Sequence, residues 1–370
     1  MPEPFQRIVR LTPLVEALAA IDAVAKPVQA YTVELAAARG RILATDVAPE
    51  GPLPPAPVAL QDGWALAAEA TGDAGAYAPA PLPRLPQWTE AGQPMPPDTD
   101  AVAPRGMVRV SGGRAEAVAA VAPGEGVLAA DGDCPAGAVL RHAGARVRDG
   151  DIAIFSAAGI KAVSVREPRL RIVKVRDDPI LAAAAQFIVN AANRFGCAAA
   201  LGQADGDLDS VLRDRGADAI IVIGGTGGGR NDGAVQALAR AGQVGAHGIA
   251  LSPGESAAFG AVDSRPVLLV PGRLDAAVSV WSTLGRRLLA RLTGASEDDA
   301  GCTASLTRKI SSTVSVAEFV PVRRDGDKAE PLATRYLPLS ALAKANGFVL
   351  VPAESEGYQA GSTVLVRSWP

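Results

Sequence analysis

Apolar residues in the first part of the chain recur at intervals of three and four positions, as they do along one face of an α-helix. This pattern predicts helix from Leu11 to Arg39, interrupted at Pro27 and resumed over Tyr31 to Ala38, because proline cannot continue a helix interior. The residues that define the apolar face are Leu14, Leu18, Ile21 and Val24.

The next segment, from Pro49 to Pro97, is rich in proline and glycine, and residues 78–86 alone contain four prolines. Each proline removes a backbone donor, so this stretch is not helix interior. We expect residues 46–142 to form a β-rich domain inserted into a helical domain made of 1–45 and 143–167. Short apolar runs predict strands inside the inserted domain at 107–110, 115–121 and 138–140.

From Pro168 onward, short apolar runs alternate with amphipathic segments. The runs predict strands at 170–175, 197–201, 217–223, 247–251 and 267–270. The amphipathic segments predict helices at 180–195, 207–215, 232–240 and 275–292. Strands that are apolar on both faces and alternate with helices indicate a parallel sheet covered on both sides. Residues 168–294 are therefore expected to form a doubly wound α/β domain.

A polar linker at 294–301 precedes a segment in which polar and apolar residues alternate. Segments 313–322, 348–351 and 363–366, with a turn at 324–327, predict a small β-domain over 302–370. The fold class expected for the whole chain is a multidomain α/β protein.

Composition narrows the class of protein. The formal net charge of −3 argues against a surface for nucleic acid or an anionic membrane. No apolar stretch approaches 18 residues and no signal-peptide pattern is present, so we expect a cytoplasmic protein.

Two histidines exclude a multi-histidine metal centre, and three cysteines far apart exclude a disulfide scaffold. Of these cysteines, Cys197 is expected to be a small buried apolar residue. His142 and His247 are expected to have solvent or core roles.

The strongest local signal is a run of glycines directly after the apolar strand at 217–223. Five glycines within six residues let successive backbone N–H groups surround an oxyanion, and Arg230 adds positive charge. A ligand at the carboxyl end of a parallel strand is typical of open α/β sheets. A flexible turn capped by Asn231 or Asp232 is the alternative, but it does not require five glycines. The run consists of Gly224, Gly225, Thr226, Gly227, Gly228 and Gly229.

Several acidic residues are candidates for a role near this glycine run, at the carboxyl edge of the predicted sheet, which we call the rim. Asp232 is either an ordinary helix cap, which local sequence favours, or a ligand for Mg²⁺ beside bound phosphates. Asp177 and Asp178 follow the first strand of the same sheet, so they either share that cation or begin a helix with Pro179 in its first turn. Asp62 is either part of a turn or an acid brought to the site from elsewhere. Two further turns, Pro253-Gly254 and Pro271-Gly272, are expected on the same rim.

Several segments occur in an order that resembles a known family. They are residues 38–46, Pro54-Pro55 with Asp62-Gly-Trp-Ala65, Met95–Val102, Ala217–Asp232, Ser252-Pro-Gly254, Pro271-Gly272 and Ala345–Phe348. Together they resemble the molybdopterin molybdenumtransferases, the bacterial MoeA family related to the E domain of gephyrin. The similarity extends over nearly the whole chain.

This resemblance implies an elongated helical domain, an inserted β-rich domain, a pterin-binding α/β domain and a C-terminal β-barrel. It also implies a homodimeric transferase that inserts molybdate into adenylylated molybdopterin, releases AMP and uses Mg²⁺. Other cofactor-maturation proteins or a molybdoenzyme client are the partners it suggests.

The resemblance also assigns roles to particular residues. The catalytic residues implied are Asp178 and Asp232, which hold the metal, and Asp62, which reaches the site across the dimer. The ligand-binding residues implied are Gly224 to Gly229, Arg230, Pro253, Gly254, Pro271, Gly272 and Arg273.

Some positions depart from the family pattern. The family's Lys-Pro-Gly-Lys motif reads Ser252-Pro-Gly-Glu255 here, and each lost lysine removes a charge-assisted contact worth roughly 1.5–3 kcal/mol. Arg146 replaces an acid, and Gly227 replaces a serine. Arg230 and Arg273 supply positive charge from new positions. A second hypothesis is therefore a homologue without turnover that binds molybdopterin or a related nucleotide as a carrier or accessory protein.

Overall fold

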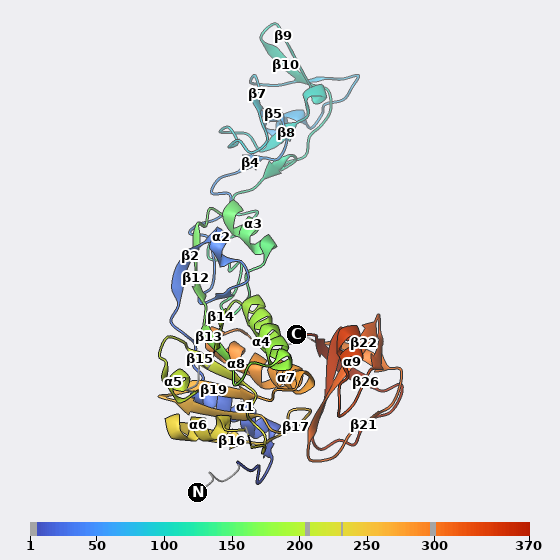
Figure 1. The fold of residues 1–370 in the computed structure, drawn as a ribbon. Helices are drawn as coiled ribbons and strands as arrows, with labels where there is room; N and C mark the ends of the chain where they lie inside the picture. The colour runs from blue at the N-terminus through green and yellow to red at the C-terminus, as the bar shows by residue number, and fades with distance from the viewer. Residues whose placement is uncertain (1–5, 204–207, 231, 297–300) are drawn as a thin grey trace. The chain divides into compact units, whose positions relative to one another are not determined.

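The structure is a computed structural model that describes residues 6–203, 208–230, 232–296 and 301–370. The chain divides into two compact units, each described here by itself (Figure 1). The first unit comprises Met1–Thr45, Ala143–Ile152 and Ala162–Pro370. The second comprises Asp46–His142 and Ala153–Lys161.

A six-stranded sheet forms the centre of the first unit, in the order β14-β13-β15-β19-β18-β16. The first four strands are parallel, as the apolar runs predict, and β15 is buried along its whole length. β18 runs antiparallel to β19, and β16 runs antiparallel to β18. β18 was not predicted from the sequence. The strands are β13 (Arg169–Lys174), β14 (Ala198–Gln203), β15 (Ala219–Ile223), β16 (Gln243–His247), β18 (Ala258–Val262) and β19 (Arg265–Val270).

Helices cover both faces of this sheet, which explains why its central strand is apolar throughout. Ile221 and Ile223 pack into one core with α1, α4, α7 and α8, whereas Ile220 and Val222 pack into another with α5 and α6. The predicted helix at 275–292 is continuous but contains a π-helical turn, η3 (Trp281–Gly285). The helices are α1 (Leu14–Val24), α4 (Pro179–Arg194), α5 (Leu208–Arg213), α6 (Ala234–Ala241), α7 (Leu274–Val280) and α8 (Arg286–Thr293).

Two sequence expectations in this unit are wrong. Tyr31 to Ala38 is not one helix: β2 (Tyr31–Glu34) pairs with β12 (Ala162–Arg166), and only α2 (Leu35–Ala38) is helical. Pairing with a strand far along the chain overrides the local helical spacing. The run at 247–251 is not one strand either, because Gly248 has a φ of +86° and separates β16 from β17 (Ile249–Ser252).

Strand β17 belongs to a different sheet. It pairs in parallel with β1 (Thr12–Pro13) and with β22, which begins the C-terminal part of the same sheet. There β22, β23, β20, β26 and β24 close into a five-stranded barrel, because β24 also pairs with β22. This confirms the C-terminal β-barrel. Its strands are β20 (Cys302–Leu306), β22 (Ala317–Asp325), β23 (Lys328–Pro331), β24 (Gly347–Val351) and β26 (Thr363–Ser368).

Small, mostly β-branched side chains fill the barrel, including Val320, Val349 and Val364. Short elements complete the first unit: β3 (Ile42–Leu43), β21 (Ile310–Ser311), β25 (Gly357–Tyr358) and α9 (Leu339–Lys344). Helix α3 (Asp149–Ala157) runs from the first unit into the second.

The second unit is built from short strands in three small sheets. The predicted strands near 107–110 and 115–121 are present, whereas 138–140 is not a strand. The elements are β4 (Val58–Ala59), β5 (Gly63–Leu66), η1 (Ala68–Thr71), β6 (Ala80–Pro81), β7 (Gln87–Thr89), β8 (Ala101–Ala103), η2 (Arg105–Met107), β9 (Val108–Ser111), β10 (Arg114–Ala117) and β11 (Val127–Leu128). Within the described part of the chain, no helix has the length and apolar character needed to cross a membrane.

Candidate ligand-binding site

The glycine loop, residues 224–229, begins where β15 ends, at the carboxyl edge of the parallel strands. Gly224 and Gly225 have φ values of +91° and +70°, a conformation that costs little only for glycine. A Cβ at Gly224 would lie 2.9 Å from the side chains of both Leu181 and Val175. The loop therefore requires glycine for its backbone conformation and for close packing.

The backbone donors of this loop are largely unused. The Gly224 N–H donates to the Val270 carbonyl at 2.8 Å, and the Gly229 N–H donates to Asp232 Oδ2 at 2.8 Å. Between them, the N–H groups of residues 225–228 donate to no acceptor among the described residues. Successive free N–H groups of this kind can bind an oxyanion.

The loop's carbonyl oxygens, in contrast, are held by side chains from elsewhere. Gln6 Nε2 donates to the carbonyls of Gly225 at 2.9 Å and Gly227 at 2.5 Å. His247 Nε2 donates to the carbonyl of Thr226 at 3.0 Å. The Thr226 hydroxyl lies 3.0 Å from that of Ser256. The carbonyls of residues 225–227 thus accept hydrogen bonds from the protein, while the N–H groups of 225–228 remain for a ligand.

A cavity of about 290 Å³ opens beside the loop. Several residues implicated by sequence lie together in its wall, so the predicted rim forms around the loop. The lining residues are Arg176, Asp178, Ile180, Leu181, Gly224, Gly225, Thr226, Gly227, Asp232, Ser256, Pro271, Gly272 and Arg273.

Asp178 lies in this wall and also caps α4. Its Oδ1 accepts hydrogen bonds from the N–H groups of Ile180 at 2.8 Å and Leu181 at 3.2 Å. Its Oδ2 lies 4.0 Å from Arg176 Nε. Asp177 points elsewhere: it is exposed and pairs with Lys174 at 2.5 Å, which lowers the pKa of the Asp177 carboxyl. Asp178 therefore begins α4, as one of the two alternatives predicted, and a role of Asp178 in binding a cation stays a prediction.

Asp232 does not cap α6, contrary to the preference from local sequence. The N-cap is Gly233, and α6 begins at Ala234. The Asp232 carboxylate instead turns back and accepts the Gly229 N–H, which closes the glycine loop. Asn231, the other cap considered, lies outside the described residues. Asp232 is therefore half-buried in the cavity wall, with Oδ1 accepting no hydrogen bond from the described residues.

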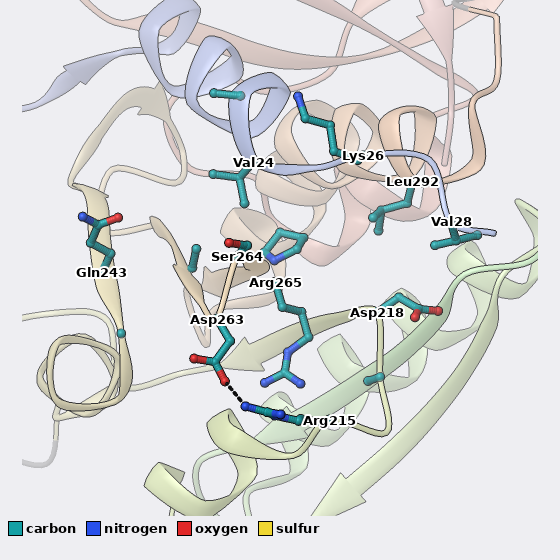
Figure 2. Close-up of a pocket in the computed structure, with 15 residues that line it drawn as sticks. Val24, Lys26, Val28, Arg215, Asp218, Gln243, Asp263, Ser264, Arg265 and Leu292 are labelled. Atoms are coloured by element: carbon teal, nitrogen blue, oxygen red, sulfur yellow. Dashed lines mark hydrogen bonds and ion pairs between the residues drawn. The ribbon is translucent and has the colours of Figure 1, made fainter.

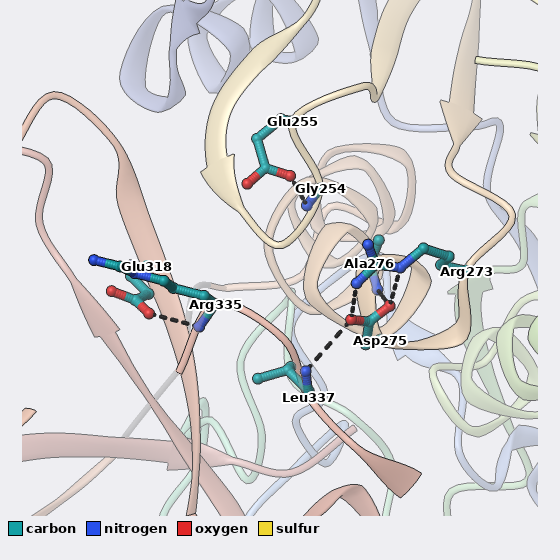
Figure 3. Close-up of polar contacts among 8 residues, drawn as sticks. All are labelled: Gly254, Glu255, Arg273, Asp275, Ala276, Glu318, Arg335 and Leu337. Carbon is teal, nitrogen blue, oxygen red and sulfur yellow. Dashed lines mark hydrogen bonds and ion pairs between the residues drawn. The ribbon is translucent and has the colours of Figure 1, made fainter. Parts of the chain in front are cut away.

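Arg273 lies between two cavities, but its charge is locally balanced. Its Nε donates to Asp275 Oδ1 at 3.1 Å and its Nη2 donates to Oδ2, and these hydrogen bonds raise the pKa of the guanidinium. Asp275 is buried and also accepts the N–H groups of Ala276 at 2.8 Å and Leu337 at 3.4 Å (Figure 3). Arg273 therefore replaces only part of the positive charge of the lost lysines.

The Pro253-Gly254 turn follows β17, which belongs to the barrel-containing sheet and not to the six-stranded sheet. Pro253 lines a second cavity of about 340 Å³ against the barrel, and Arg273 lines both cavities. Figure 3 shows Glu255 accepting the Gly254 N–H at 3.0 Å. Buried Glu318 accepts the Arg335 N–H at 2.8 Å. Pro253 is not among the residues that line the cavity beside the glycine loop, and the predicted role of this turn in ligand binding stays a prediction.

The remaining implicated residues are not among those that line the cavity beside the glycine loop. Arg230 is exposed. Asp62 belongs to the second unit, where its Oδ1 accepts the Ala91 N–H at 2.8 Å, so its role stays a prediction. Arg146 stacks on the Phe195 ring with its Cζ 4.5 Å from the ring centroid.

Sequence reasoning missed four residues of this site: Gln6, Arg176, His247 and Ser256. Arg176 directly precedes Asp177 and Asp178, so its place in the sequence could have identified it as a residue of the site. Gln6 and His247 contact the loop from 219 and 21 residues away in the chain, and no local pattern marks such contacts. The expectation of a solvent or core role for His247 omitted its contact with the loop.

A larger cavity, of about 1150 Å³, lies near the amino ends of β15 and β19 (Figure 2). Most of its charged groups are already paired. Arg215 pairs with Asp263 at 3.0 Å, and Asp218 pairs with Arg169 at 2.9 Å. Arg265 donates to the Leu212 carbonyl at 2.6 Å. Most charged side chains that line this cavity are thus engaged within the protein.

Three family models match successive parts of the chain. The MoeA N-terminal region (domains I and II) matches residues 12–159, the probable molybdopterin binding domain matches 180–291, and the MoeA C-terminal region (domain IV) matches 303–369. The chain belongs to the MoeA family. The resemblance inferred from the order of the motifs is confirmed, and the glycine loop lies within the molybdopterin binding domain of this MoeA protein.

Individual relatives support the same assignment. Molybdopterin molybdenumtransferase 1 of Mycobacterium tuberculosis is 25% identical over 416 residues, which cover 94% of this chain and 97% of that protein. A protein of Methanocaldococcus jannaschii named for molybdopterin biosynthesis is 27% identical over 147 residues, and this chain spans only 35% of its length.

Solved structures agree on the fold. A molybdopterin biosynthesis MoeA protein from Pyrococcus horikoshii superposes with a TM-score of 0.80 at 24% identity, covering 98% of this chain and 100% of that one. A molybdenum cofactor biosynthesis protein from Pyrococcus furiosus gives 0.65 at 21% identity, covering 97% of this chain and 100% of that one.

Proposed function

We propose that this chain inserts molybdate into adenylylated molybdopterin and releases AMP. Its membership of the MoeA family places it in molybdenum cofactor biosynthesis. The observation that supports the activity is the set of four N–H groups at residues 225–228, which are unused by described residues. Residues 225–227 line a cavity that also contains two carboxylates.

The glycine loop is proposed to bind the phosphate end of the pterin. Phosphate oxygens accept hydrogen bonds, and backbone N–H groups at the carboxyl edge of a parallel sheet suit them. Arg176 and Arg273 in the cavity wall add positive charge, and Arg273 is already oriented by Asp275. Backbone donors supply binding that does not depend on the lysines this chain lacks.

Mg²⁺ is proposed to bind between Asp178 and Asp232 and the pyrophosphate of the substrate. Each carboxylate has one oxygen that accepts no backbone N–H from the described residues, Asp178 Oδ2 and Asp232 Oδ1. No group of three or more possible metal ligands occurs among described histidines, cysteines, aspartates and glutamates. Mg²⁺ requires only one or two carboxylates when phosphates and water complete its shell, so the donor set fits. When bound, the ion neutralises charge that develops on the leaving phosphate.

Asp62 is proposed to act on molybdate from a second copy of the chain in a homodimer. It lies in the second unit, as an exposed carboxylate held by one backbone N–H. The protein is proposed to act in the cytoplasm and to deliver its product to a molybdoenzyme or to another maturation protein.

Binding without turnover is the second candidate, and the cavity against the barrel favours it. Glu255 occupies a position where the family pattern has lysine, and buried Glu318 lines the same cavity. Two carboxylates disfavour an oxyanion such as molybdate. Under this alternative, the chain holds molybdopterin or a related nucleotide as a carrier.

The deciding experiment measures AMP release from adenylylated molybdopterin with molybdate and Mg²⁺. Asp232→Asn keeps an oxygen that accepts the Gly229 N–H but removes the charge that binds the cation. We expect wild type to release AMP and the variant to release it at least about a hundredfold more slowly. A rise of about 2.7 kcal/mol in the activation free energy slows a reaction by this factor. Molybdopterin affinity should change much less.

Asp263→Asn is the matched control, because Asp263 lies near the other end of the sheet and pairs with Arg215. It should release AMP at the wild-type rate. Tight binding of molybdopterin by wild type without AMP release would establish the second candidate. Absence of both binding and release would refute both functions.

A further inference from the structure

We propose that Gln6 and His247 are positioning residues that orient the glycine loop for its anionic ligand by holding its carbonyl oxygens. This inference rests on the proposed function, because it assigns the way in which that site is prepared. Neither residue lies in the cavity wall, so both act through the loop.

The side-chain amide of Gln6 has only one orientation that fits its surroundings. Gln6 is 7% exposed, and its terminal group faces two carbonyl oxygens, those of Gly225 and Gly227. Carbonyl oxygens accept hydrogen bonds but do not donate them, so the NH₂ group must face them. Oε1 is then buried and receives no hydrogen bond from the described residues. Gln6 is therefore held at this position by the hydrogen bonds that its NH₂ group donates.

Holding a carbonyl fixes the N–H group of the following residue. The peptide unit is planar and trans, so its C=O and N–H bonds point in opposite directions. Gln6 holds the carbonyls of residues 225 and 227 and thereby orients the N–H groups of Thr226 and Gly228. His247 holds the carbonyl of residue 226 and orients the N–H group of Gly227. These three N–H groups are among the four that remain free.

A glycine-rich loop needs such support more than other loops do. Glycine has the largest range of backbone conformations, so fixing each one costs roughly 1–2 kcal/mol of conformational entropy. Hydrogen bonds formed before the ligand arrives remove part of this cost from binding. The two residues come from separate segments, one preceding β1 and the other ending β16, so their effects can be measured separately.

Gln6→Glu tests the first contact, because glutamate has nearly the same shape but presents an oxygen where the NH₂ group was. We expect molybdopterin to bind about tenfold more weakly, as follows from losing a buried donor against two acceptors. In the AMP-release assay, KM should rise while kcat is retained. Gln186→Glu, a surface glutamine of α4, adds the same charge to the first unit and should leave affinity and KM unchanged.

His247 is tested with a pair of variants. His247→Leu removes the donor to Thr226 and should weaken molybdopterin binding about tenfold, whereas His247→Gln retains a donor and should restore most of the affinity. Failure of the glutamine variant to recover what leucine loses would show that the imidazole has only a packing role.

Amide hydrogen exchange gives a readout that needs no ligand. In Gln6→Glu, exchange should accelerate at Gly224 and Ala234, whose N–H groups bond to the carbonyls of Val270 and Gly225 at the two ends of the loop. If wild type binds no molybdopterin, the proposed function fails, and exchange alone then decides whether Gln6 orders the loop. Unchanged exchange in Gln6→Glu would overturn the inference, as would wild-type molybdopterin affinity in both Gln6→Glu and His247→Leu.

Discussion

Cys197 and Cys302 carry the same thiol in opposite environments. Cys197 is 4% exposed between α4 and β14, and its burial raises the pKa of the thiol to about 12 despite the nearby Arg146 guanidinium. Cys302 is exposed at the start of β20. Because the thiolate is the reactive form, Cys197 is inert near neutral pH, as its expected role as a small apolar residue requires.

Thiol labelling checks this difference. At pH 8, a maleimide should modify Cys302 in the native protein within minutes and modify Cys197 only after denaturation, with mass spectrometry identifying each site. Cys302→Ser should remove the rapid labelling. Rapid native modification of Cys197 would show that the helix–strand packing around it is wrong.

The residues of the site differ in how far local sequence reveals them. The glycine run and Asp178 were identified because their function depends on the backbone within a few positions. Asp232 was placed on the correct rim, but its partner was wrong, since its carboxylate bonds back to Gly229 rather than forward to α6. Gln6 and His247 were missed because their partners lie elsewhere in the chain.

At the scale of secondary structure, Gly248 determines which sheet the chain joins. Its positive φ ends β16 and lets β17 leave for the sheet that contains the barrel. A Cβ at this position would lie 2.4 Å from Ile8 Cγ2 and 3.2 Å from the Arg10 carbonyl. The segment that carries Gln6 and the break between the two strands are therefore packed against each other.

Gly248→Ala should lower the free energy of unfolding by roughly 2 kcal/mol, because alanine disfavours this backbone conformation and also meets close neighbours. Urea unfolding measures the change. Gly150→Ala in α3 is the control, since its Cβ would meet nothing within 4 Å and alanine favours helix by about 0.5–1 kcal/mol. Equal stability of Gly248→Ala and wild type would contradict the role given to this break.

The elements that were predicted correctly are those whose pattern is set by burial on both faces. β15 and β19 are central and nearly wholly apolar, so their type is evident from sequence alone. β2 and β18 depend on antiparallel partners, one of them more than 120 residues away, and their local patterns are ambiguous. Pairing, rather than propensity, decides such strands.

At the scale of the whole molecule, the residues with proposed roles are distributed over both compact units. The glycine loop, Asp178 and Asp232 belong to the first unit and Asp62 to the second. The order of the motifs along the chain was enough to recognise the family, because that order reflects the succession of domains. The role of Asp62 stays a prediction, because no local pattern encodes contacts between copies of the chain.

Mixing two inactive variants tests whether Asp62 acts across a homodimer. Asp62→Ala and Asp232→Ala should each be inactive, but subunits exchanged between them form mixed dimers in which one of the two sites is intact. Random exchange should restore about a quarter of the wild-type AMP release.

The control combines both substitutions in one chain and mixes it with wild type, so that mixed dimers hold no site with both acids. The AMP release of this mixture should fall below the value expected if each wild-type copy acted independently of its partner. No recovery in the first mixture, despite demonstrated exchange, would rule out a contribution of Asp62 from the second copy.

The sharing of β17 between β1 and the barrel has a practical consequence for shortened forms of this protein. Phe319 and Phe348 of the barrel are fully buried in the same core as α1, α4 and α8, and β22 covers one edge of β17. A chain ended at the polar linker would expose both an unpaired strand edge and a large apolar surface, which together favour aggregation. The C-terminal barrel thus covers apolar surface of the rest of the first unit, and shortened forms made for crystallisation or fusion should keep it.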